Sequence, residues 1–242
     1  EMEEEIRLLE LRADTGALMG ETVLASQLKP AGSPLWPLPY RPSDALRRRG
    51  STPAYADGVL VCQTSEHDFA ALDLATRQLL WMYTLPEDET SPTRRQLLIG
   101  LRPADSAQTA LQAARWLDSG VVLVSGVAIL APAPGNPLLA VALRAGRLLW
   151  SVARRDALYV GTADAQRLVL VGRSGLRALK LIDGTPAWPE EHVPLPAGAA
   201  PGGHGIMAEG RLHLPLSTGG LLIVDIQSGR PIAECRMWDE LS

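Results

Sequence analysis

An eleven-residue segment recurs five times along the chain, and this repeat constrains the fold more than any other feature. Three copies end in tryptophan: residues 71–81 (ALDLATRQLLW), 140–150 (AVALRAGRLLW) and 178–188 (ALKLIDGTPAW). Residues 223–233 fit with Ala233 at the last position, and residues 10–20 fit with Gly20 there. The copies align without internal gaps. Recurrence of this kind is the signature of a repeat architecture, in which each copy belongs to one small structural unit.

A second feature precedes four of the copies. It consists of an acidic residue, a short small or polar spacer and a run of β-forming residues. The acids are Asp57, Asp118, Asp164 and Glu209. Three of them stand 16 residues before the third position of the following copy, and Asp118 stands 24 residues before it. The Pro- and Gly-rich insert at 131–137 (APAPGNP) accounts for the difference, so the spacing supports a true repeat.

Residues 52–85 show what one unit contains. Apolar and β-branched runs alternate there with short polar segments that favour turns. The pattern predicts four strands, at residues 52–56, 59–63, 69–74 and 79–83. Their short connections indicate an antiparallel meander.

The hairpin between the last two strands of each unit carries glycine at one position in four of five copies, namely Gly16, Gly146, Gly184 and Gly229. Glycine suits a turn residue that needs a positive φ, so Arg77, which replaces it in one copy, should cost that turn some stability. The tryptophans recur at equivalent positions, and we expect their indoles to lie flat between neighbouring units, over the next turn. A ligand-stacking platform is the alternative.

A four-stranded sheet of this size cannot bury both faces by itself, and stacking several around an axis covers them. We therefore predict an all-β fold, a β-propeller of four-stranded antiparallel blades. The predicted units are a half blade at 1–26 and blades at 50–85, 112–153, 157–190 and 203–238, with inserts at 27–49 and 86–111.

The repeat resembles the tryptophan-docking motif A-x-D-x-x-T-G-K-x-x-W of the PQQ-like (quinoprotein alcohol dehydrogenase-like) β-propeller family. The matching residues are Ala71, Asp73, Thr76 and Trp81 in one copy, Ala140, Gly146 and Trp150 in the next, and Ala178, Gly184 and Trp188 in the third. The family includes quinoprotein alcohol dehydrogenases and non-catalytic relatives such as an outer-membrane assembly lipoprotein. The resemblance is specific for fold and weak for activity, because one propeller hosts many functions.

The resemblance implies seven or eight blades and, in the enzymes, an adjacent Cys-Cys disulfide, a Ca²⁺ site and a catalytic Asp. This sequence has only Cys62 and Cys235, which we expect to be half-buried strand thiols, and no acidic cluster with calcium-loop spacing. We therefore name no catalytic, cofactor-binding or metal-binding residue, and expect neither PQQ nor calcium. Four and a half blades predict an incomplete ring or the C-terminal part of a seven- or eight-bladed propeller. A closed small propeller is the alternative.

The inserts and the histidines are further candidates for a site. Residues 28–42 contain five prolines and predict an extended covering loop. Residues 104–117 predict a short helix on the propeller rim; for both segments, partner binding is the alternative. The histidines are isolated, and we assign no ligand role to any of them: His67, His192, His204 and His213. His204 lies in a Gly-rich loop that lacks the strand–helix arrangement of a phosphate-binding loop.

Charge and hydropathy exclude two classes of partner. The net charge is −4 and the pI is near 5.6, which disfavours sequence-independent nucleic-acid binding. The short basic clusters at 47–49, 94–95 and 154–155 predict solvated loops or turns. The most apolar run, at 120–134, is shorter than the ~18 residues of a membrane-spanning helix. We expect neither nucleic acid nor membrane insertion.

Three functions stay open. The first is a non-catalytic propeller scaffold for protein–protein interaction within a larger cell-envelope protein, with another protein or the remaining blades as partner. The others are a fragment of a PQQ-dependent dehydrogenase and a glycan-binding or hydrolase propeller. Because the resembled proteins mostly work outside the bacterial cytoplasm, the resemblance implies an extracytoplasmic location, in the periplasm or cell envelope.

Overall fold

The computed structural model describes residues 2–29, 52–64, 68–85, 120–132 and 136–236. These residues form five separate antiparallel sheets. The first, which we call the half-blade, has two strands, β1 (Met2–Leu11) and β2 (Leu18–Lys29). Each of the other four sheets has four strands in a row, and we call them blades 1 to 4 in chain order.

The strands of the blades follow one another along the chain. Blade 1 contains β3 (Ala54–Ala56), β4 (Val59–Gln63), β5 (Asp68–Asp73) and β6 (Gln78–Thr84). Blade 2 contains β7 (Val121–Val124), β8 (Val127–Leu130), β9 (Leu138–Ala142) and β10 (Leu148–Val152). Blade 3 contains β11 (Ala157–Ala163), β12 (Arg167–Gly172), β13 (Gly175–Lys180) and β14 (Val193–Pro194). Blade 4 contains β15 (Ile206–Ala208), β16 (Arg211–Pro215), β17 (Gly220–Asp225) and β18 (Pro231–Arg236).

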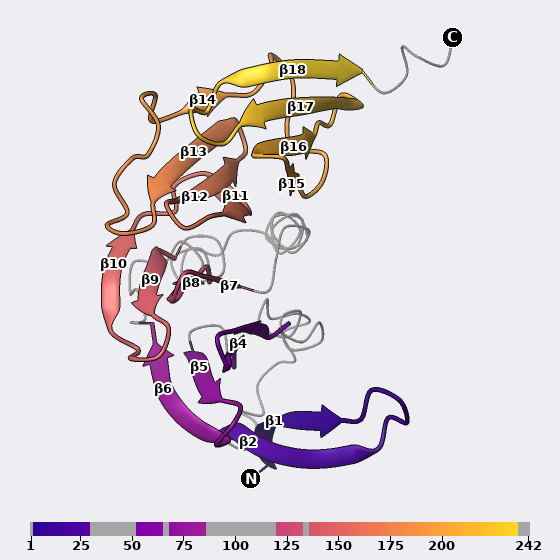
Figure 1. The fold of residues 1–242 in the computed structure, drawn as a ribbon, viewed down its shortest axis with the longest axis vertical. Coiled ribbons are helices and arrows are strands. Elements are labelled where there is room, and N and C mark those ends of the chain that lie inside the picture. The colour runs from indigo at the N-terminus through magenta and orange to yellow at the C-terminus, as the bar shows by residue number, and fades with distance from the viewer. Residues whose placement is uncertain (1, 30–51, 65–67, 86–119, 133–135, 237–242) are drawn as a thin grey trace, which may run out of the picture.

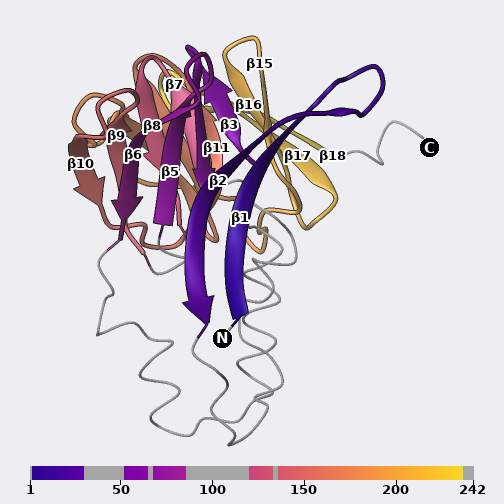
Figure 2. The same ribbon diagram turned by 90° about the horizontal axis from the view of Figure 1, so that it is seen from below.

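The sheets fan out side by side into an open arc, with the half-blade at one end and blade 4 at the other (Figure 1). The first strands of the blades lie toward the inside of the arc and the fourth strands toward the outside, and the second view shows the same stacking (Figure 2). The predicted all-β fold of four-stranded antiparallel blades in an incomplete ring is confirmed. The helix predicted at 104–117 and most of the Pro-rich loop predicted at 28–42 lie outside the described residues.

Burial along the strands reflects the position of each blade in the arc. In blade 3, which has a neighbour on each side, consecutive residues of β12 and β13 are buried, so both faces of the sheet are covered. In blade 4, buried and half-exposed residues alternate along β17, because only one face of this sheet packs on another described sheet. The apolar runs predicted from sequence are thus sandwiched strands inside the arc.

The core is divided among the junctions between sheets. One cluster joins blades 1 and 2, a second joins blades 2 and 3, and a third joins blades 3 and 4. A smaller cluster, formed by Leu24 of the half-blade with Cys62, Ala70 and Leu72 of blade 1, holds the half-blade in place. Stability is therefore distributed over junctions, as in other repeat architectures.

Candidate functional site

The recurrent tryptophans lie at the junctions between blades. Each indole Nε1 donates a hydrogen bond to a backbone carbonyl in the hairpin of the next blade. The three bonds are Trp81 to Leu143 (2.7 Å), Trp150 to Leu181 (2.8 Å) and Trp188 to Ile226 (2.9 Å). All three side chains are buried. The prediction that these residues dock one blade on the next is confirmed, because each acceptor occupies the fourth position of the repeat.

The hairpin glycines lie directly under these indoles. Gly146, Gly184 and Gly229 have φ between 66° and 75°, a conformation that favours glycine. A Cβ on Gly146 would lie 2.5 Å from Cγ of Trp81, and the other two glycines are crowded by Trp150 and Trp188 in the same way. The glycine therefore serves two purposes, since it permits the turn and also lets the ring approach the backbone.

Aspartates hold the same hairpins in shape. Asp225 Oδ1 accepts hydrogen bonds from the backbone N–H and the hydroxyl of Ser228, and these bonds hold the pKa of Asp225 below its ordinary value. The hydroxyl and N–H of Thr185 lower the pKa of Asp183 in the same manner. Charge-assisted bonds of this kind stabilise a turn locally.

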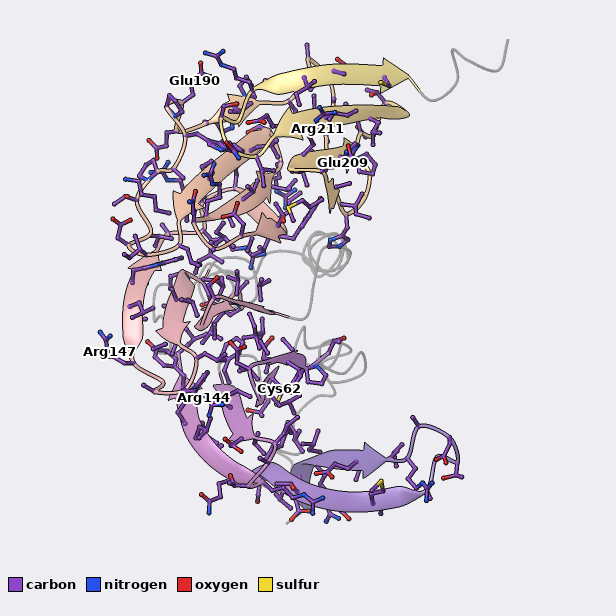
Figure 3. All side chains as sticks on the ribbon, viewed as in Figure 1. Cys62, Arg144, Arg147, Glu190, Glu209 and Arg211 are labelled. Carbon is purple, nitrogen blue, oxygen red and sulfur yellow. The ribbon has the colours of Figure 1, made fainter. Side chains whose placement is uncertain are left out.

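Arginines add a second type of bond across the junctions. Arg144 of blade 2 donates to the backbone oxygen of Asp57 (2.6 Å) and pairs with the Asp73 carboxylate, both in blade 1 (Figure 3). Arg167 of blade 3 donates to the backbone oxygen of Gln227 in blade 4 (2.8 Å). Sequence reasoning missed these contacts, because nothing in the repeat indicates which arginine faces a neighbouring turn.

Arg154 corrects the prediction of a solvated turn at 154–155. Its side chain is buried, and its guanidinium donates to the backbone oxygens of Pro132 in blade 2 and of Ala157 and Leu158 in blade 3. Burial lowers the pKa of Arg154 to about 10, so the side chain remains charged near neutral pH. The hydrogen bonds explain why the charge tolerates burial. The adjacent Arg155 is exposed and pairs with Glu191, as a solvated residue would.

The junction between the half-blade and blade 1 departs from this pattern. Gly20 stands at the repeat position of Trp81, Trp150 and Trp188, and Arg77 stands at the position that is glycine in the other four copies. Arg77 has φ of 58° and lies over Gly20, and its guanidinium pairs with Glu10 at 2.7 Å. At this junction the small residue, Gly20, lies on the first sheet and the large residue, Arg77, on the second, which is the reverse of the other junctions. An exposed ion pair takes the place of the buried indole.

The described histidines lie in three different settings. The Tyr159 hydroxyl donates to the oxygen of Gly203 and accepts from the N–H of Gly205, and the rings of Tyr159 and His204 are 4.3 Å apart. The Gly-rich loop is thus held by the neighbouring blade. His213 lies half-buried on β16. His67 lies outside the described residues.

His192 belongs to a polar cluster that could not be assembled from the sequence. The Ser174 hydroxyl donates to Asp156 (3.1 Å) and lies 3.5 Å from Nε2 of His192. A nucleophilic triad needs the imidazole between the serine and the carboxylate. Here Ser174 lies between Asp156 and His192, so the three residues are not in the order in which a carboxylate-oriented imidazole activates a serine.

The described residues do not fit the calcium and disulfide chemistry of the quinoprotein enzymes. Both cysteines lie on strands and are free, but neither is half-buried as expected. Cys62 is buried in blade 1 (Figure 3), and Cys235 is exposed on β18 in blade 4. Burial raises the pKa of Cys62 to about 11. Among the described ranges, no three His, Cys, Asp or Glu side chains gather to hold a metal ion.

One shallow depression lies at an edge of blade 3. Its volume is about 390 Å³, and its lining residues are Ala165, Gln166, Arg167, Lys180, Ile182 and Ala187. The lining is apolar and cationic.

Within the part of the chain that the structure describes, no helix has the length and hydropathy to cross a lipid bilayer.

Solved structures of related propellers share this fold. BamB from Moraxella catarrhalis is 17% identical with a TM-score of 0.50, over 75% of this chain and 48% of that chain. Quinohemoprotein alcohol dehydrogenase from Comamonas testosteroni is 13% identical with a TM-score of 0.50, over 76% and 34% of the two chains. The dihydro-heme d1 dehydrogenase NirN is 12% identical with a TM-score of 0.55, over 96% and 41%.

These likenesses concern the fold alone, and the chain spans about half or less of the length of each of these structures. No curated protein matches it in sequence. The family model described as outer membrane protein assembly factor BamB, PQQ_2, matches residues 104–237, which is more than half of the chain. The chain therefore belongs to this BamB-like family of PQQ-like propeller repeats.

Proposed function

We propose that the chain is a non-catalytic propeller scaffold that binds other proteins as part of a larger protein of the cell envelope. The observation that carries the proposal is the match of residues 104–237 to the family of an outer membrane protein assembly factor. The family description also supports a location outside the cytoplasm. Propeller relatives include dehydrogenases, so fold alone does not decide between a scaffold and an enzyme.

The bonding within the described blades supports a structural use of the motif. The indoles, Arg144 and Arg154 all bond to backbone groups or carboxylates of a neighbouring blade. A scaffold requires this kind of rigidity, because binding loops on a propeller must be held in place by the sheets. We infer that the binding surface is the part of the exposed rim around the depression of blade 3, which is lined in part by Ile182, a residue that is 80% exposed.

The proposal predicts binding to a component of an outer-membrane-protein assembly machinery. The probes are the purified subunits of that machinery, immobilised one by one, with binding of the chain measured by biolayer interferometry. We expect saturable binding to at least one subunit. Ile182→Asp should weaken it about tenfold or more, because a charge at an interface must be desolvated. Ala75→Asp, at the equivalent exposed hairpin position of blade 1, should leave it unchanged.

The same preparation tests the enzyme alternative. Added pyrroloquinoline quinone and Ca²⁺ should give neither a protein-bound quinone spectrum nor alcohol-dependent reduction of a dye. Quinone uptake with alcohol oxidation, or failure to bind any assembly subunit, would overturn the scaffold proposal.

A further inference from the structure

We propose that the depression at the edge of blade 3 binds an extended segment of a partner protein that carries both apolar and acidic residues. A large apolar side chain of that segment fills the depression, and a neighbouring carboxylate pairs with Lys180. The inference rests on the protein-binding role proposed above, because it names the chemistry of the partner that this surface takes.

Lys180 stands at the third repeat position, where two of the other copies have aspartate. In blade 4 that aspartate, Asp225, holds the hairpin by accepting a hydrogen bond from the N–H of Ser228 (2.7 Å). In blade 3 a carboxylate further along the hairpin does this, because Asp183 accepts from the N–H and the hydroxyl of Thr185. The hairpin of blade 3 therefore needs no acid at position 180, and a cation stands there.

The ammonium of Lys180 is available to a ligand. The residue is exposed, and its side chain makes no hydrogen bond or ion pair with any residue in the described ranges. Hydrogen bonds from Thr185, and to a smaller extent the charge of Lys180, lower the pKa of Asp183, whose Oδ1 already accepts two bonds in its own turn. The other cation of the lining, Arg167, donates to backbone oxygens of blade 4 and to Gln166. A carboxylate from outside therefore finds its partner in Lys180.

Ala187 leaves space at a position where the repeat has larger residues. The tenth residues of the other four copies are large and apolar: Met19, Leu80, Leu149 and Ile232. Ala187 and Ala165 line the depression, which has a volume of about 390 Å³. Ligand pockets begin at about 300 Å³, so the depression has room for a large side chain.

Ile182 extends the apolar surface beside Lys180. It is 80% exposed, the highest value among the large apolar residues that the structure describes, and it belongs to none of the described core clusters. The fifth residues of the other four copies are small or polar: Asp14, Ala75, Arg144 and Gln227. The fold therefore does not require an isoleucine here. An apolar surface rimmed by polar groups is typical of an interaction site.

Three departures from the repeat thus meet at one place in one blade, and together they define the occupant. The apolar hollow between Ile182 and Ala187 favours an apolar side chain, because filling it removes apolar surface from water. The unpaired charge of Lys180 favours a carboxylate beside that side chain, because a bound partner that covered the ammonium without pairing it would incur a desolvation cost. A segment that carries both groups is complementary to the depression in shape and in charge.

A set of short peptides tests this chemistry. The probe is acetyl-Leu-Asp-Leu-Asp-Leu-amide, titrated into the isotope-labelled chain, and we expect saturable shifts of the backbone amide resonances of Lys180, Ile182 and Ala187. The same peptide with asparagine for aspartate should bind about threefold to fivefold more weakly, because an exposed ion pair contributes little free energy. The peptide with serine for leucine should bind about tenfold more weakly or worse, because it fills the hollow with less apolar surface.

Substitutions that restore the residues of other copies test the site from the side of the chain. Lys180→Asp should weaken binding of the aspartate peptide about tenfold or more, and Lys180→Arg should preserve it. Ala187→Leu fills the hollow and should weaken the aspartate and the asparagine peptides alike. Ala165→Leu, at an exposed turn position, fills it from the other side without touching the core and should do the same. Arg147→Asp, an equal change of charge on the outer side of blade 2 (Figure 3), is the matched control and should leave binding unchanged.

Three results would overturn the inference. The first is the absence of saturable shifts with the aspartate peptide, and the second is equal binding of the aspartate and asparagine peptides. The third is self-association of the unchanged chain, seen by sedimentation velocity and removed by Lys180→Asp, because the occupant would then be a second copy.

The assembly subunits distinguish this inference from the function proposed above. Subunit binding that Ile182→Asp weakens but Lys180→Asp and Ala187→Leu leave unchanged would overturn the inference and keep the scaffold role. Peptide binding as expected, together with no binding of any subunit, would overturn the scaffold role alone. Subunit binding that Lys180→Asp and Ala187→Leu both weaken would support the two together.

Discussion

At the scale of single residues, one indole combines three interactions at each junction. It buries a large apolar ring, donates a hydrogen bond to a backbone oxygen, and fills the space that the facing glycine leaves open. Loss of the ring would leave both a cavity and a carbonyl without its donor, since Trp150 alone bonds to Leu181 in this way among the described bonds. Removal of the Trp150 ring should therefore lower the free energy of unfolding more than removal of an exposed side chain does.

Trp150→Ala should lower the free energy of unfolding by about 3–5 kcal/mol, as is typical for removal of a buried tryptophan. Trp150→Phe keeps a ring but loses the N–H, and should cost about 1–3 kcal/mol. Urea unfolding followed by far-ultraviolet circular dichroism measures both. Ile182→Ala, at an 80% exposed position, serves as the control and should change stability by less than about 0.5 kcal/mol. Equal effects of the three substitutions would contradict the docking role of Trp150.

At the scale of elements, the recurring unit is the hairpin together with its aspartate. Asp225 and Asp183 each accept two hydrogen bonds within the turn, and each has a lowered pKa. These carboxylates are solvent-exposed or nearly so, and their contribution is local to the hairpin. The hairpin is also the element that receives the neighbour's indole, so turn geometry and blade docking are coupled.

Asp225→Asn should lower stability near neutral pH and change how stability depends on acid. Because the pKa of Asp225 is lower in the folded protein than in the unfolded chain, its contribution is fully present above about pH 4. The contribution is lost as the pH falls through the folded-state value, so the difference between the variant and the unchanged protein should shrink below about pH 4.

Thermal unfolding across this pH range measures the effect. Because the cause is hydrogen bonding to Ser228, the difference should persist in about 0.5 M NaCl, where exposed long-range charge interactions are screened. A difference that is constant with pH, or that salt abolishes, would contradict this account.

At the scale of the whole molecule, the junctions are not equivalent. The three junctions that join blades 1 and 2, blades 2 and 3, and blades 3 and 4 each contain a buried indole. The half-blade is instead held by a small apolar cluster and an exposed ion pair between Arg77 and Glu10. Exposed ion pairs contribute only about 0–1 kcal/mol. The half-blade should therefore be the least stable part of the described arc, with its amides exchanging fastest among the long strands.

Restoring the usual pair at this junction should stabilise the half-blade. Gly20→Trp alone should destabilise it, because even a Cβ added at Gly20 would lie 3.3 Å from Arg77 Nη2, which leaves no room for an indole unless Arg77 moves. Arg77→Gly alone removes a weak ion pair but also the strain of a positive φ, so its net effect should be small. The double variant lets the indole lie over glycine, and we expect a favourable coupling energy of about 1 kcal/mol or more. Hydrogen exchange of β1 and β2 measures it, and simple additivity of the two changes would argue against the exchange of positions.

Local patterns in the sequence were enough to predict the strands and hairpins. The alternation of apolar runs and turn residues predicted four strands in 52–85, and β3 to β6 lie within two residues of them. The docking of Trp81, Trp150 and Trp188 on the next hairpin followed from their equivalent positions. Both inferences succeed because the information is repeated, so each copy supports the interpretation of the others.

Contacts between blades depended on geometry that no single segment encodes. The carbonyls that surround Arg154 come from residues as far apart as Pro132 and Leu158, and Ser174 meets Asp156 and His192 only when blade 3 is folded. The sequence by itself determined the blade, its hairpin and its docking residue, because these depend on neighbours along the chain. Only the tertiary structure decided which polar groups meet across a junction and which side chains become buried there, because these depend on how the sheets stack.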